Sequence, residues 1–121
     1  MAKWQEISVL VFNDLAGYSG LTALLSNGID SIYPLIADAE EGDTFILYVT
    51  EYTGKASKDG SYNFTITIMS YAPSYNASLT VADAVTAAIT ASTNAYGIET
   101  GRPVFIAENE FYIEQIFNLK K

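Results

Sequence analysis

Alternating hydrophobic and polar positions predict one long β-hairpin in the middle of the chain. The stretch "TFILYVTEYTGKASKDGSYNFTITIMSY", Thr44 to Tyr71, holds two runs rich in Thr, Tyr, Ile, Val and Phe. A polar link ending in Asp59-Gly60 separates them, and Asp-Gly is a strong hairpin signal. The apolar positions of the second run are Tyr62, Phe64, Ile66 and Ile68. They alternate with polar residues, which is the period of a half-buried strand.

The first run of the hairpin has a different pattern. One of its faces starts apolar and becomes polar, in the order Phe45, Leu47, Val49, Glu51, Thr53 and Lys55. The tip, Tyr52 to Gly60, is therefore expected to project past the core. The pattern leaves the pairing register open, because a change of one residue in the loop turns every side chain to the other face.

Helical spacing precedes the hairpin. It predicts a helix over Trp4 to Ala16, ended by Gly17, whose buried stripe is Trp4, Ile7, Leu10, Val11 and Leu15. A short helical turn is predicted from Ser19-Gly20 to Asn27-Gly28. A short strand is expected around Ile32 to Ile36, at a sheet edge, because Pro34 cannot donate to a ladder.

A second long helix is predicted after the hairpin. Ser78 or Asn76 is the candidate cap, and the helix is expected to run to about Asn94 or Tyr96, before Gly97. Its predicted buried stripe is Leu79, Ala82, Val85 and Ile89, with Tyr96 as a further candidate. The opposite face, Thr80, Asp83, Ala87, Thr90, Ala91 and Asn94, is small and almost uncharged. A solvated helix face ordinarily carries Lys and Glu.

Two strands are expected to close the chain, around Val104 to Ala107 and Phe111 to Leu119, joined by the polar turn Glu108-Asn109-Glu110. The order of elements predicts a single α+β domain over residues 1–121, with a mostly antiparallel sheet, a long β-hairpin and helices packed on one face. The stability of this domain should depend on Phe64, Ile66, Val85 and Ile89.

Composition narrows the chemistry that the chain can perform. It has 121 residues with no Cys and no His, so a thiolate site and a Ser-His-Asp triad are impossible. A net charge of -8 argues against binding to phosphate backbones. The N-terminus has no signal-peptide core, and the apolar runs are too short to span a bilayer, so a soluble protein made in the cytosol is expected.

The acidic clusters do not match known cation or catalytic patterns. The first is "DAEEGD", with Asp38, Glu40, Glu41 and Asp43, and it lacks the spacing of a calcium loop. The second is Glu108, Glu110 and Glu114, and nothing in the sequence marks a pocket around it. "GYSG" and "TGKASKDG" match neither phosphate-loop pattern. We therefore predict no catalytic residue, no cofactor and no metal. Of a structural protein, a binding module and an enzyme, the enzyme is the least favoured.

Charge is placed unevenly along the chain. The span from Gly60 to Ile98 contains one charged side chain, Asp83, and a surface that avoids charge is commonly covered by a partner. The candidate assembly interface is Tyr52, Thr53, Lys55, Lys58, Thr80, Asp83, Ala87 and Thr90. Nine Tyr and six Phe keep a second hypothesis open: a small binding module whose Tyr-rich sheet holds a peptide or an apolar ligand.

The whole pattern resembles a known family. An N-terminal helix, "LLSNGIDSIYPLIADAEEGDTFILYVTEYTGKASKDGSYNFTITIMSY", the single helix "SLTVADAVTAAITA" and a terminal strand pair are similar to the small tail-completion proteins of long-tailed bacteriophages and prophages. These are the tail-terminator or head-to-tail joining proteins. The resemblance covers nearly all of the chain and is one of pattern, without a diagnostic motif.

The resemblance implies a non-enzymatic structural protein of a phage tail or neck, made in the host bacterial cytoplasm and located in the virion. It implies a homo-oligomeric ring, commonly a hexamer, that ends the tail tube and joins it to the head connector. The partners would be other copies, the tail-tube protein and a connector or neck protein. Residues 1–43 carry one Lys and seven acidic residues, a net charge of -6. If some of this acid faces the lumen, DNA would pass through without specific binding.

Overall fold

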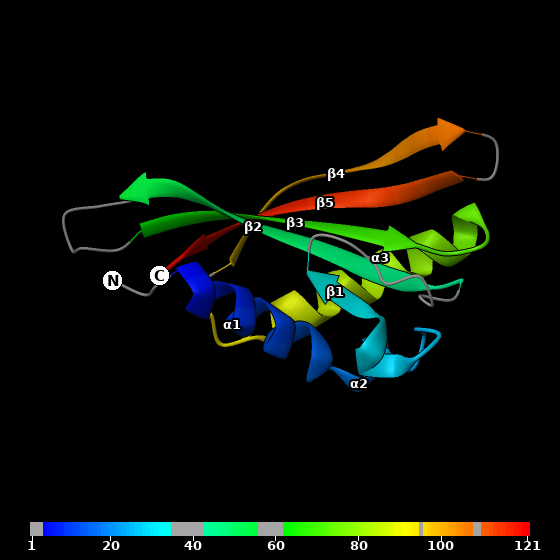
Figure 1. The fold of residues 1–121 in the computed structure, drawn as a ribbon, viewed down its shortest axis with the longest axis horizontal. Helices are drawn as coiled ribbons and strands as arrows, with labels where there is room; N and C mark the ends of the chain where they lie inside the picture. Colours follow the sequence, from blue (N-terminus) through cyan, green and yellow to red (C-terminus); the bar gives the residue numbers. More distant parts are fainter. Residues whose placement is uncertain (1–3, 35–42, 56–61, 95, 108–109) are drawn as a thin grey trace.

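The computed structural model describes residues 4–34, 43–55, 62–94, 96–107 and 110–121. The chain forms an α+β fold in which helices cover one face of a mostly antiparallel sheet, as predicted (Figure 1). Helix α1 spans Trp4–Ala16, α2 spans Ser19–Thr22, and a 3-10 turn, η1, spans Gly28–Ser31. Helix α3 spans Tyr75–Ala91.

The sheet has five strands in the order β1-β2-β3-β5-β4. Their bounds are Ile32–Pro34 for β1, Phe45–Lys55 for β2, Tyr62–Tyr71 for β3, Tyr96–Ala107 for β4 and Glu110–Lys120 for β5. Strand β1 pairs with β2 in parallel, and the other three pairings are antiparallel. Pro34 therefore lies in an edge strand, as expected, and Ile36 falls outside the described residues.

Helix α1 follows its predicted pattern closely. Ile7, Val11 and Leu15 are fully buried, and Leu10 packs partly against them. Trp4 was wrongly placed in the buried stripe: it is 51% exposed and its indole bonds to Thr50 of β2 instead. The helix ends where Gly17 was expected to end it, and the Gly17 N–H donates to the Asn13 carbonyl at 2.9 Å. A side chain at position 17 would press against that same oxygen, which lies 3.0 Å from the site of an added Cβ.

The long hairpin is present, and the structure settles its register. Tyr48 pairs with Ile68 and Tyr52 with Phe64, so the inner face of β2 carries Ile46 and Tyr48. The apolar face predicted from Phe45, Leu47 and Val49 is the outer, half-buried face. The alternation was correct, and the pattern could not assign it to a side of the sheet, because both faces of β2 begin apolar.

The arm ends with a bulge. Tyr52 pairs with Phe64 and Gly54 with Asn63, which leaves Thr53 as the extra residue on β2. Gly54 has a φ of +116°, a conformation that residues with a Cβ rarely adopt. Residues 56–61, which follow Lys55 in the tip, lie outside the described residues.

Helix α3 begins and ends earlier than predicted. Ser74 is the cap, and its hydroxyl accepts the Ala77 N–H at 3.1 Å, whereas Ser78 is buried inside the helix. Ala82, Val85 and Ile89 are buried as expected. Leu79 was wrongly placed in the buried stripe, since it is 36% exposed and Val81 is buried instead. The helix ends at Ala91, before Asn94, because Gly97 and Tyr96 belong to β4.

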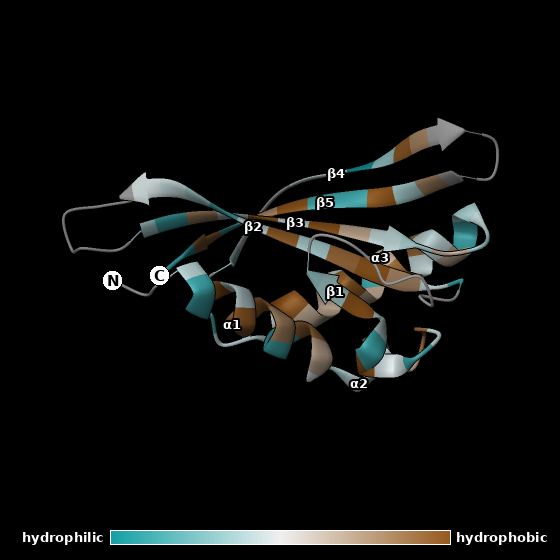
Figure 2. Ribbon diagram, viewed as in Figure 1, coloured by the Kyte–Doolittle hydropathy of each residue, from teal (hydrophilic) through white to brown (hydrophobic). Residues whose placement is uncertain are grey.

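The core lies between the helices and the inner face of the sheet. Phe64, Ile66 and Ile68 of β3 meet Phe117 and Leu119 of β5 on this face, all fully buried. Figure 2 shows hydrophobic residues concentrated where α1 and α3 lie against the sheet. Gln115 of β5 fixes α3 on the sheet, donating to Thr86 Oγ1 at 2.8 Å and to the Ala82 carbonyl at 3.2 Å.

Candidate functional site

The hairpin arm β2–β3 reaches one end of the molecule, and the β4–β5 hairpin extends toward the opposite end (Figure 1). Near the arm, the indole Nε1 of Trp4 donates to the Thr50 carbonyl at 2.9 Å. The Tyr52 ring lies 6.3 Å from that of Trp4 and 5.7 Å from that of Phe64. The inner face of β2 thus carries a second ring at the bulge, beyond the half-buried Thr50. The other face turns polar at Glu51, as the sequence predicts.

The second hairpin also exposes an aromatic residue. Strand β4 starts at Tyr96, eight residues before the strand predicted at Val104, and it pairs along β5 as far as Ala107. Phe105 is 69% exposed and its ring lies 5.9 Å from that of Phe111. Residues 108–109, the predicted turn, lie outside the described residues.

The candidate assembly residues lie on two different elements. Tyr52 and Thr53 are exposed on β2, and Lys55 is the last residue of that strand, while Lys58 falls outside the described residues. Thr80, Asp83 and Thr90 are exposed on α3 and Ala87 is half-buried there. The second group forms a continuous strip, since these residues follow at helical spacing opposite the buried stripe. We call Thr80, Asp83, Ala87 and Thr90 the α3 outer strip.

The outer face of the sheet is a surface that the sequence analysis missed. No helix among the described residues covers it, and a row of rings crosses four strands: Tyr33, Phe45, Tyr71 and Tyr112. Phe45 stacks on Tyr71 at 4.5 Å, Tyr33 meets Phe45 edge-on at 6.2 Å, and Tyr112 lies 5.0 Å from Tyr71. Partial burial and the neighbouring Tyr112 raise the pKa of Tyr71 above its usual value.

Aliphatic side chains extend this aromatic row along the strands. Leu47 pairs with Met69, Val49 with Thr67, and Val104 with Tyr112. Together with the four rings they form the outer sheet face, and all of them are half-buried. The alternation in β2 signalled this face, since Phe45, Leu47 and Val49 were recognised as one apolar set.

An ion pair lies beside the outer sheet face, near the β4 edge. Arg102 Nε donates to Glu114 Oε1 at 3.1 Å. The Arg102 side chain is 67% exposed and that of Glu114 is 16% exposed. The contact uses one of the five guanidinium donors. Among the described residues, no other group forms a hydrogen bond or ion pair with Arg102.

Both edges of the sheet are unsuited to strand addition. Strand β1 has three residues and ends at exposed Pro34. Strand β4 contains Pro103, and bulges interrupt it between Ile98 and Thr100 and between Phe105 and Ala107. Short edges, prolines and bulges are the features by which sheets avoid pairing with other chains. We therefore expect copies of the chain to contact one another through the faces of the molecule and not through strand pairing at the sheet edges.

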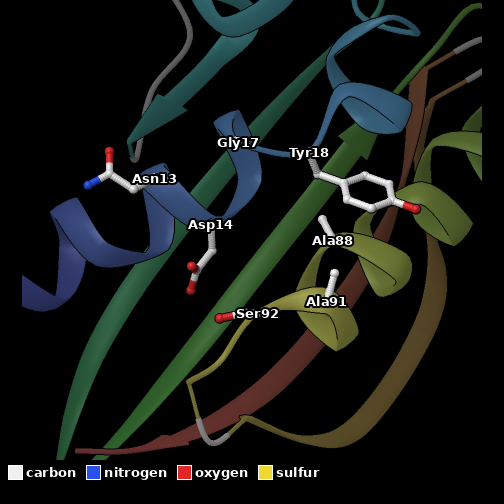
Figure 3. Close-up of a pocket in the computed structure, with 7 residues that line it drawn as sticks. All are labelled: Asn13, Asp14, Gly17, Tyr18, Ala88, Ala91 and Ser92. Atoms are coloured by element: carbon white, nitrogen blue, oxygen red, sulfur yellow. The ribbon is translucent and has the colours of Figure 1, made fainter.

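A shallow cavity of about 190 Å³ lies where the C-terminal ends of α1 and α3 approach (Figure 3). Asn13, Asp14, Gly17, Tyr18, Ala88, Ala91 and Ser92 line it. Asp14 Oδ2 accepts from the Tyr96 hydroxyl at 2.7 Å and from Asn94 Nδ2 at 3.0 Å. Burial, and then this bond to Asp14, raise the pKa of Tyr96 far above its usual value.

This network ties the end of α1 to the start of β4, because Tyr96 of that strand and Asn94 just before it both donate to Asp14. Lys121 Nζ donates to Asn94 Oδ1 at 2.8 Å and extends it to the chain end. Over the described part of the chain, no three acidic residues gather as a metal site would require. Asp43 is exposed, Glu114 pairs with Arg102, and Asp38, Glu40, Glu41 and Glu108 lie outside the described residues.

Comparison with known proteins gives one informative result. No protein-family model and no curated protein sequence matches the chain. Its fold is similar to that of a solved chain described as belonging to the virion of a native gene transfer agent particle. The TM-score is 0.65 at 15% sequence identity, over 91% of this chain and 90% of that one. The similarity is therefore one of fold. No helix of the described residues is long and apolar enough to cross a membrane.

Proposed function

We propose that the chain is a non-enzymatic structural protein of a phage or phage-like virion, and that it forms the ring that ends the tail tube and joins it to the head connector. The observation that carries the proposal is the fold similarity to a chain of a gene transfer agent virion over 91% of this chain. The similarity covers about nine-tenths of both chains, so it extends over most of the fold and not one motif alone. The sequence pattern of tail-completion proteins supports the finer assignment.

The arrangement of surfaces supports self-assembly in a ring. The two hairpins reach opposite ends of the molecule (Figure 1), and the α3 outer strip and the outer sheet face lie on different elements. Contacts between two different surfaces of identical subunits are heterologous, and they close into a ring when the rotation permits. The partners of such a ring are other copies, the tail-tube protein and the head connector, with DNA passing through its lumen.

The acidic residues of the first 43 positions bear on that lumen. Glu6, Asp30 and Asp43 are exposed, and Asp14 is half-buried where it accepts from Tyr96 and Asn94. Exposed carboxylates along a channel would repel the phosphates of DNA and keep it from sticking. The three exposed carboxylates are therefore the described residues that could serve this role.

The aromatic row favours a second hypothesis, a binding module for a peptide or an apolar ligand. Small-molecule sites are usually concave, whereas Tyr33, Phe45, Tyr71 and Tyr112 lie across one face of a sheet. An extended surface of this kind suits a macromolecular partner better than a small ligand. A monomer that binds peptides would fit this hypothesis, and a self-associating chain would fit the ring.

Binding to tube ends tests the proposal directly. Purified tail tubes that lack their terminator are mixed with the full chain and imaged by negative stain, and tube length is followed while tube protein is still being added. We expect rings at one end of the tube and arrested elongation. Tubes that stay uncapped and keep growing at saturating concentrations of the chain would contradict the assignment.

A further inference from the structure

The molecule has two large faces without a partner, and they lie on opposite sides of it. Helices α1 and α3 cover the inner face of the sheet, so the outer sheet face looks away from them (Figure 1). The α3 outer strip in turn looks away from the sheet, because Val81, Val85 and Ala88 bury the opposite side of the helix. A two-layer molecule thus ends in a bare sheet on one side and a weakly charged helix on the other.

The chemistry of the two faces is complementary. The outer sheet face carries rings and aliphatic side chains, and such a face is normally buried against another layer. The α3 outer strip has short side chains, Thr80, Ala87 and Thr90, that allow a helix to approach closely. Leu79 and Tyr75 stand beside it at 36% and 45% exposure and add apolar area. A helix with such a surface is suited to lie on a sheet.

The charges on the two faces also match. Asp83 is exposed and is the one charged residue of α3. Arg102 is the basic residue near the β4 edge of the outer sheet face, and its contact with Glu114 leaves the terminal amino groups of its guanidinium available. A guanidinium with free donors and a carboxylate without a partner form a strong pair when brought together.

From these observations we infer that the α3 outer strip of one copy packs on the outer sheet face of the next copy, with Asp83 of the first beside Arg102 of the second. The inference rests on the proposed ring and names the two surfaces that build it. The two surfaces lie on opposite sides of the molecule, so one neighbour cannot return the contact and it is heterologous. Heterologous contacts close into a ring when the rotation permits.

The size of the sheet supports this inference. Four long strands about 4.8 Å apart and about 34 Å long present roughly 650 Å². A standard protein interface takes about 600 to 1,000 Å² from each partner. The outer sheet face therefore has the area that a stable contact between copies needs, and the interrupted edges of β1 and β4 leave this face as the larger available surface.

Exchange of the two charges tests the inference. Asp83→Arg places two cations in the contact, and Arg102→Asp adds a third carboxylate to those of Asp83 and Glu114. Each variant should therefore self-associate at least about tenfold more weakly than the wild type. The double variant Asp83→Arg with Arg102→Asp restores an opposite pair and should recover association. Sedimentation velocity at several concentrations gives the reading, and circular dichroism melting shows that each variant folds. Single variants that associate like the wild type, or a double variant as weak as the singles, would overturn the inference.

Cross-linking tests which two surfaces lie close together, without a measurement of affinity. The chain has no Cys, so single cysteines can be placed at Thr80 on α3 and at Thr100 on β4, which leave Asp83 and Arg102 intact. With a short bis-maleimide, a mixture of the two variants should give cross-linked dimers, and each variant alone should give few. Dimers from Thr80→Cys alone would reveal a two-fold contact and contradict the inference.

These results separate the inference from the proposed function. If the wild type assembles and caps tubes and the charge variants do so equally well, the inferred contact is contradicted and the proposed ring is supported. If the wild type neither assembles nor caps tubes, both are wrong.

Discussion

Trp4 and Thr50 lie 46 positions apart in the chain and are joined by a hydrogen bond of 2.9 Å from the indole Nε1 to the carbonyl oxygen. The bond connects the first turn of α1 to the middle of β2, where the hairpin leaves the core. The Tyr52 ring lies next to the same indole, at 6.3 Å between centroids. The start of α1 therefore holds the base of the arm, although Trp4 is 51% exposed.

Replacement of Trp4 by Phe should loosen this attachment. The ring can still lie near Tyr52, but the donor is lost, so we expect a loss of about 1 kcal/mol in the free energy of unfolding. Urea denaturation measures the loss, and hydrogen exchange should rise along β2. Gln5→Ala, at an exposed neighbouring position, is the control and should change stability by less than about 0.5 kcal/mol. Equal stability of the two variants would contradict a holding role for Trp4.

The pair of Tyr96 and Asp14 predicts a dependence of stability on alkaline pH. A free Tyr loses its proton near pH 10, whereas burial and the bond to Asp14 raise the pKa of folded Tyr96 above that value. Above about pH 10 the unfolded chain then binds fewer protons than the folded one, so the stability present at lower pH falls as pH rises. Tyr96→Phe should remove this group's share of the fall.

The same variant should cost about 1 to 2 kcal/mol at neutral pH, because a hydrogen bond to a carboxylate is lost. Urea titrations at pH 7, 10 and 11 compare it with the wild type. Part of the alkaline loss should remain in Tyr96→Phe, since the pKa of Tyr71 is raised as well. Parallel stability curves for the two proteins from pH 7 to 11 would count against the assignment.

The core should depend strongly on β3. Phe64 is fully buried between the helices and the sheet, so Phe64→Ala should destabilise the fold by about 3 to 5 kcal/mol. Thr65 is its neighbour on the outer sheet side, half-buried and facing away from the core, and Thr65→Ala is the matched control. Thermal and urea unfolding of the pair should differ by several kcal/mol. A similar cost at the two positions would show that the inner face had been misassigned.

Sequence patterns predicted the elements whose periodicity was unambiguous. Ile7, Val11 and Leu15 recur at helical spacing, and the alternation from Phe64 to Ile68 specified one inner face for β3. In β2 the two faces are both apolar at first, so alternation alone could not tell which faces the core. The row of Phe45, Tyr71 and Tyr112 arises from pairing between β2, β3 and β5, which no local pattern contains.

Caps and strand starts were harder to predict for a physical reason. Ser74, Asn76 and Ser78 are all good cap residues, and the choice of Ser74 depends on how the chain leaves β3. Tyr96 belongs to β4 because it pairs with Leu119 of β5, and its hydroxyl also reaches Asp14 of α1, 82 positions away in the chain. Such long-range contacts override local preference, which is why the helix was predicted to run too far.

The tip of the arm should serve assembly rather than folding. Exchange of Lys55 and Lys58 for Ser changes the charge of the tip, and exposed changes usually shift stability by less than about 0.5 kcal/mol. We expect melting temperatures close to that of the wild type and weaker binding to other copies or to the tube, measured by sedimentation. An unfolded double variant, or a folded one that assembles fully, would exclude this role for the arm.

We expect the working unit to be a closed ring of identical copies, and native mass spectrometry of the full chain over a wide concentration range can decide this. A closed ring predicts one dominant oligomer whose mass stops growing once it forms, a hexamer if the resemblance to tail terminators holds, with few intermediates. A chain that remains monomeric at every concentration, or that grows without a limiting size, would contradict the claim.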